Sequence, residues 1–133
     1  MKAGHRYGFP LLIIIGYFVL CFALHPWLGY LLDSDGVAYL TIARQVAEGH
    51  WMRGVNGLWS PLNAWILAPC IQQGWDVWMS AKVMNILVGA VVLIQVHHLF
   101  RRVALSPLTH HLLLATAAIG MAHHVYYQLF GDV

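Results

Sequence analysis

A long apolar run without a formal charge extends from Phe9 to Leu32. A helix of about 20 apolar residues crosses the hydrocarbon core of a bilayer, and this run is longer than that. Only 9% of the residues are charged, whereas a soluble domain carries about a quarter. Lys2 and Arg6 precede the run, but it is long for a signal peptide and no small-residue cleavage site follows it. We therefore predict an uncleaved membrane-spanning helix over residues 9–32.

Two further apolar segments follow, over residues 83–100 and 108–130. The short connector between them contains Arg101 and Arg102, and short loops rich in Lys and Arg stay in the cytoplasm. The basic N-terminus belongs on the same side. The sequence therefore predicts an all-α, multi-pass integral membrane protein with about three spans and a cytoplasmic N-terminus. Residues 33–81 then form an outer loop, and the inner membrane of a bacterium is the expected location.

The predicted outer loop contains two short helical patterns. The first runs from Asp35 to Glu48 and has one apolar face, formed by Tyr39, Ile42, Ala43, Val46 and Ala47. Ser34 or Asp35 suits its start and Gly49 its end. The second starts at Pro61, with apolar residues at Leu62, Trp65, Ile66, Pro69 and Cys70. Both are too short to span a membrane, so we predict amphipathic helices at its surface or re-entrant in it.

The order of these elements resembles the N-terminal part of GT-C membrane glycosyltransferases. The resemblance lies in Asp35-x-x-x-Tyr39-x-x-Ile42-Ala43-Arg44, then Glu48-Gly49, then Ser60-Pro61-Leu62. The segments "NILVGAVVLIQVHHLFRR" and "YYQLFGDV" are similar to the family's second span and to the end of its third. This family includes the protein O-mannosyltransferases and the bacterial aminoarabinose and mannosyl transferases. The chain thus resembles a single N-terminal segment of a longer polytopic enzyme.

The resemblance implies an inverting transfer of a hexose or pentose from a polyprenyl-phosphate donor to a glycan, lipid or protein acceptor at the outer membrane face. Asp35 matches the acidic residue of the first outer loop, a general base that takes the acceptor's proton. Asp132 matches the second acidic position, which orients the acceptor or a divalent metal ion. No cofactor is otherwise implied.

The predicted substrate-binding residues are Tyr39, Arg44, Arg53, Ser60 and Lys82. The three cations suit the phosphate that leaves the donor. Some relatives carry a lysine before the loop proline, where this chain has Ser60, so the resemblance to the aminoarabinose branch is weaker there. This isolated chain is expected to be inactive, because three spans hardly enclose a cavity that excludes water.

Other interpretations remain open from the residues alone. Asp33 and Asp35 also suit a helix cap and a solvated flank. A small non-enzymatic membrane accessory or assembly protein is the alternative function. Three pairs of adjacent histidines suggest a metal or proton conduit as a further possible function. The first two pairs, His97-His98 and His110-His111, flank the Arg-Arg turn and can meet there. Neighbouring helical residues point about 100° apart and chelate poorly, so imidazoles at the membrane interface are the simpler reading.

The sequence indicates neither nucleic-acid binding nor a disulfide bond. The net charge of +2, without a basic cluster, gives no argument for a nucleic-acid partner. The two cysteines, Cys21 and Cys70, both lie in apolar stretches and are predicted to be unbridged thiols.

Overall fold

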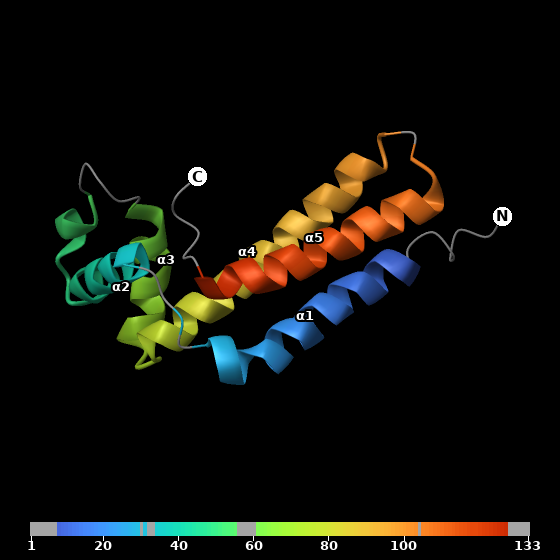
Figure 1. The fold of residues 1–133 in the computed structure, drawn as a ribbon. Coiled ribbons are helices and arrows are strands. Elements are labelled where there is room, and N and C mark those ends of the chain that lie inside the picture. The colour runs from blue at the N-terminus through green and yellow to red at the C-terminus, as the bar shows by residue number, and fades with distance from the viewer. Residues whose placement is uncertain (1–7, 30, 32–33, 56–60, 104, 128–133) are drawn as a thin grey trace. The chain divides into compact units, whose positions relative to one another are not determined.

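The computed structural model describes residues 8–29, 31, 34–55, 61–103 and 105–127. Within these ranges the chain forms five α-helices and one 3₁₀ turn, with no strand (Figure 1). The prediction of an all-helical protein is confirmed. The chain divides into two compact units, each described by itself below. The long-helix unit comprises Met1–Leu28 and Ile86–His124, and the short-helix unit comprises Gly29–Asn85 and Val125–Val133.

The long-helix unit is built from α1 (Gly8–Leu28) and most of α4 (Val77–Phe100) and α5 (Pro107–Tyr127). Its interior includes Tyr17, Cys21, Leu93 and Leu114. The Tyr17 hydroxyl donates a 3.0 Å hydrogen bond to the Ile86 carbonyl, which ties α1 to α4. Large apolar side chains remain on the outside of all three helices, including Leu12, Val19, Phe22, Leu87, Val91, Leu112 and Ile119. Such outward-facing side chains suit a lipid environment.

Two helices in the described part of the chain, α1 and α4, are long and apolar enough to cross a membrane. In its most apolar window α1 buries 11% of its residues, whereas α4 buries 50%. The third predicted span corresponds to α5, which is not one of the two. Its four histidines and two threonines make α5 more polar than the other long helices. Three spans therefore remain a prediction.

Helices α1 and α4 begin and end, respectively, close to the predicted spans, at Gly8 and Phe100, but each differs at its other end. Helix α1 continues through Pro26 but ends at Leu28, four residues before the expected limit. A proline within a helix removes one backbone hydrogen bond, and the helix ends within a turn of it. Helix α4 begins at Val77 instead of Val83, so Lys82 lies inside a helix and not in a loop. A lysine marks the end of a span only when its charge must reach water, and Lys82 is buried.

The helix ends follow the local sequence. Gly49 (φ 93°) and Gly74 (φ 83°) end α2 and α3 in the left-handed conformation that glycine adopts at no steric cost. At Gly49 the amides of Gly49 and His50 bond the carbonyls of Val46 and Gln45, which is the Schellman arrangement. The prediction that Gly49 ends this helix is confirmed. The Asp76 carboxylate accepts the Met79 amide at 2.8 Å and so caps the start of α4.

The short-helix unit contains α2 (Ser34–Ala47), the 3₁₀ turn η2 (Trp51–Gly54) and α3 (Pro61–Gln72). Figure 1 shows α2 and α3 side by side. The core between these helices and the first turns of α4 contains Tyr39, Leu40, Ala43, Val46, Ala64, Leu67, Ala68, Val77 and Ala81. The predicted apolar face of α2 is confirmed, because Tyr39, Ala43 and Val46 are all buried. Part of the segment between α2 and α3 forms the 3₁₀ turn η2.

Helix α3 packs with a side other than the one that carries the apolar residues named in the sequence analysis. Its buried residues are Asn63, Ala64, Leu67 and Ala68, whereas Leu62, Trp65, Ile66 and Pro69 are exposed. The physical reason is close packing, since Ala64 and Ala68, four residues apart, let α3 approach its neighbours. A helix whose bulky apolar side chains point outward is suited to lipid. Cys70 and Cys21 are both free thiols, as predicted.

Candidate functional site

The candidate catalytic residue Asp35 lies in the first turn of α2 and is partly buried. A carboxylate there interacts favourably with the positive end of the helix dipole. One turn later the side chain of Tyr39 is 1% exposed and belongs to the core. The packing of Tyr39 therefore fixes the helix that carries Asp35, and the carboxylate is presented from a structured element.

The C-terminal end of α2 is also held in place. The Gln72 side-chain amide at the end of α3 donates to the Ala47 carbonyl at 3.0 Å. A Cβ atom at Gly54 would lie 2.9 Å from the Trp65 indole nitrogen and 3.1 Å from a Val46 methyl group. Only glycine allows η2 to pack this closely between α2 and α3. Helix, turn and helix are therefore one packed arrangement.

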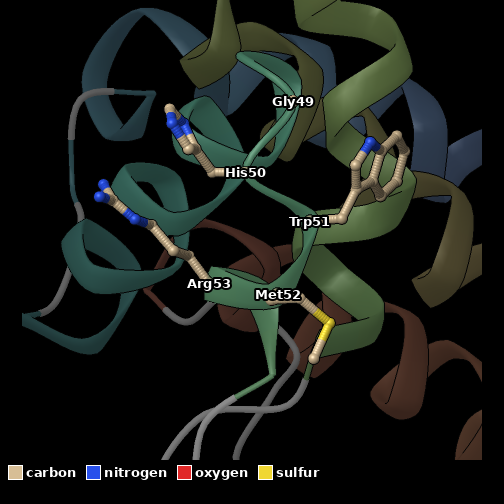
Figure 2. Close-up of a pocket in the computed structure, with 5 residues that line it drawn as sticks. All are labelled: Gly49, His50, Trp51, Met52 and Arg53. Carbon is tan, nitrogen blue, oxygen red and sulfur yellow. The ribbon is translucent and has the colours of Figure 1, made fainter.

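An open hollow of about 490 Å³ is lined by residues 49–53, at and before η2. Figure 2 shows His50 and Arg53 pointing to one side of the turn, and Trp51 and Met52 pointing to the other. His50 Nδ1 lies 4.0 Å from a carboxylate oxygen of Glu48, and both side chains are largely exposed. The hollow thus joins a side with an imidazole and a guanidinium, suited to an anion, with an apolar and aromatic side.

A second polar feature lies on α4, where Trp78, Lys82 and Asn85 occupy positions i, i+4 and i+7. We call these three residues the polar stripe. The Lys82 ammonium is 3% exposed and donates to the carbonyls of Leu31 (2.6 Å) and Tyr126 (2.8 Å). It also lies 5.8 Å and 5.6 Å from the ring centroids of Trp78 and Tyr126.

The other two members of the polar stripe make similar contacts. The Trp78 indole donates to the Gly29 carbonyl at 2.6 Å, and the Asn85 amide donates to the Val125 carbonyl at 3.2 Å. Val125 and Tyr126 lie in the last turn of α5, where the backbone carbonyls have no amide donor within their own helix. Lys82 and Asn85 of the polar stripe therefore cap the end of α5 from a neighbouring helix, while Trp78 bonds the segment after α1. Sequence analysis missed Trp78 and Asn85, although their spacing from Lys82 in an apolar helix was the available signal.

The histidines at the α4–α5 turn form a third feature, and the prediction that the first two pairs meet there is confirmed. His97 Nδ1 lies 3.1 Å from His110 Nε2, and His97 is 7% exposed. The centroid of the His111 ring lies 4.2 Å from that of Phe9 in α1, with the two rings tilted by 42°. In the described parts of the chain no three His, Cys, Asp or Glu side chains gather closely enough to hold a metal ion. The His97–His110 contact links the two helices of the hairpin.

The predicted site residues lie in different surroundings within the short-helix unit. Asp35 is partly buried, Tyr39 and Lys82 are buried, and Arg44 and Arg53 are exposed. Of the three predicted phosphate ligands, Arg44 and Arg53 are therefore open to solvent, while the Lys82 ammonium is held by carbonyls. Ser60 and Asp132 lie outside the described residues, as does Asp33. His50 was not predicted, although its place three residues before Arg53 was a signal for a shared cationic site.

Comparison with known proteins returns no match to a protein-family model, to a curated protein or to a solved structure.

Proposed function

We propose that this chain is the N-terminal membrane segment of a GT-C-type glycosyltransferase that uses a polyprenyl-phosphate sugar. The N-terminus is cytoplasmic, α2 and α3 lie at the outer face of a bacterial inner membrane, and α5 is the third span. The acceptor is a glycan, a lipid or a protein, and further spans of the enzyme complete the cavity. The proposal starts from the sequence resemblance around Asp35, Tyr39 and Arg44.

One structural observation supports the proposal most directly. Asp35 is carried by a helix whose opposite end and inner face are packed against η2 and α3, in a segment between two helices apolar enough to span a membrane. A general base must be held within hydrogen-bonding reach of the proton that it removes. A rigid helical segment at the mouth of the membrane supplies that precision.

The proposed step is a single displacement at the anomeric carbon. The Asp35 carboxylate removes the proton from the acceptor hydroxyl or amine while its oxygen or nitrogen attacks that carbon. The bond from the carbon to the phosphate oxygen breaks, and the electron pair leaves with the polyprenyl phosphate. The configuration at the carbon inverts. Arg53 and Arg44, both exposed on the same unit, are the cations that would stabilise the leaving phosphate.

The first test is sugar transfer by the Asp35→Asn variant, made in the longest reading frame that contains this segment. Membranes would be supplied with polyprenyl-phosphate sugars, and transfer to acceptor would be measured. We expect at least a 100-fold loss of transfer, because removal of a general base costs about 10² to 10⁴ in rate. Membrane insertion and protein level should stay normal.

The matched control is Asp76→Asn, the same chemical change in the same unit. Asp76 caps α4, and asparagine caps a helix about as well as aspartate. We therefore expect transfer by this variant to stay within about threefold of the parent. Unchanged transfer by Asp35→Asn would reduce Asp35 to a structural role. Absence of any transfer from the parent frame would favour the non-enzymatic accessory function.

A further inference from the structure

The turn η2 divides its side chains by chemistry. Trp51 and Met52 point to one side, and His50 and Arg53 point to the other (Figure 2). Met52 is 80% exposed and Trp51 is 48% exposed, so neither contributes much to the core. Two large apolar side chains at the tip of a turn are costly to leave in water. Their exposure favours an apolar surrounding outside the short-helix unit.

The backbone of the turn η2 is held by hydrogen bonds and by packing at its ends. The Arg53 amide donates to the His50 carbonyl at 2.9 Å, and the Val55 amide donates to the Met52 carbonyl at 3.1 Å. Before the turn, Gly49 adopts a positive φ of 93°, and after it Gly54 packs against Val46 and Trp65. Both ends of η2 are therefore fixed by glycines that no other residue replaces without strain or collision.

Helix α3 of the same unit also exposes apolar side chains. Trp65, whose indole nitrogen would lie 2.9 Å from a Cβ atom at Gly54, is 41% exposed. Leu62 and Ile66, its neighbours on the outward side of α3, are 59% and 48% exposed. The turn and the helix therefore both offer apolar side chains, and the Arg53 cation and the His50 imidazole lie on the other side of the turn.

We propose that Trp51 and Met52 insert into the interfacial region of an anionic phospholipid bilayer, and that Arg53 and His50 bind the lipid phosphates beside them. Two properties of the segment favour lipid as the occupant. A phospholipid combines the two chemistries that η2 separates, because tryptophan is favoured at headgroup depth and Arg binds phosphate with paired hydrogen bonds. The segment also lies in the chain between α1 and α4, both apolar enough to enter the same bilayer.

Insertion of the turn into lipid does not depend on glycosyl transfer, and the experiment that tests it measures fluorescence quenching, not sugar transfer. The full chain would carry a single cysteine at Met52→Cys, in a background of Cys21→Ala and Cys70→Ala, labelled with an environment-sensitive fluorophore. It would be reconstituted into vesicles of phosphatidylcholine and phosphatidylglycerol whose acyl chains are brominated near the headgroup. The matched control is the same label at Glu48→Cys, an exposed position whose carboxylate lies 4.0 Å from His50 Nδ1.

We expect bromine to quench the label at position 52 at least threefold more strongly than the label at position 48. Raising the phosphatidylglycerol fraction should increase quenching at position 52, and the added change His50→Gln with Arg53→Gln should abolish that increase. Equal quenching at the two positions would overturn the inference. So would a label at 52 that resists both bromine and aqueous iodide, since it would then be covered by protein, either a second copy or another chain.

Discussion

Lys82 is the residue at which charge and burial conflict most. It is 3% exposed within α4, a helix otherwise apolar enough to span a membrane. An isolated buried ammonium would be very unfavourable, but here two backbone carbonyls and two aromatic rings surround it. The Tyr126 carbonyl in turn needs a donor, because it lies in the last turn of α5. The Lys82 ammonium therefore supplies the donor that the Tyr126 carbonyl needs, and the carbonyl supplies an acceptor for the buried ammonium.

Replacing Lys82 with methionine should destabilise the protein, because the Leu31 and Tyr126 carbonyls would lose a donor at a position closed to water. Methionine conserves the length of the side chain, so the packing loss is small. We expect a decrease of about 1 to 3 kcal/mol in the free energy of unfolding. Chemical unfolding in detergent micelles would measure it.

The control for Lys82→Met is Arg44→Met, which removes an exposed cation from the same unit. Surface changes of this kind stay within about 0.5 kcal/mol. Equal stabilities for the two variants would mean that the Lys82 hydrogen bonds add nothing to the fold.

At the scale of the element, the short helices are defined by their ends and by what they pack against. Gly49 and Gly74 end α2 and α3, and Asp76 begins α4, all by local backbone chemistry. Which side of α3 faces inward is decided differently. The small side chains of Ala64 and Ala68 allow close approach, so the bulkier Trp65 and Ile66 stay outside.

The close approach of η2 to α3 predicts opposite effects for one substitution at two glycines. Gly54→Ala should lower the free energy of unfolding by about 1 to 2 kcal/mol, because its methyl group would press on Trp65 and Val46. Gly120→Ala, within α5 and with nothing within 4 Å, should raise it by up to about 1 kcal/mol through helix propensity. Thermal unfolding in micelles compares them. A neutral Gly54→Ala would show that η2 is looser than its contacts indicate.

At the scale of the whole molecule, the number of spans decides the topology. α1 and α4 are apolar enough to cross a membrane, while α5 carries His110, His111, His123 and His124. The Arg101-Arg102 turn favours a cytoplasmic position between α4 and α5. With three spans the end of the chain is outside, and with two it is in the cytoplasm.

A reporter that is active only in the cytoplasm separates these topologies. Fused after Arg102 it should be active, because that position follows the second span in a chain with a cytoplasmic N-terminus. Fused after Val133 it should be at least tenfold less active if α5 crosses the membrane. Activity of both fusions, at equal protein levels, would contradict the third span. A reporter fused after Gly74, in the predicted outer segment, is the control and should be inactive.

The sequence by itself determined the helical class, the two most apolar helices, the inner face of α2 and the glycine that ends it. These features depend on local propensity and on a periodicity that one helix carries alone. The position of Asp35 at the start of α2 could be predicted in the same way, whereas the residues near it in space could not.

Only the tertiary structure decided the inner side of α3, the early start of α4 and the partners of Lys82. In each case the deciding quantity was a contact between segments distant in sequence. Apolarity distinguishes inside from outside only where water surrounds the protein. In this protein bulky apolar side chains such as Trp65 and Leu62 also lie outside. The packed face is then selected by small side chains and by backbone carbonyls that need a hydrogen-bond donor, and neither can be recognised from a pattern of apolar residues.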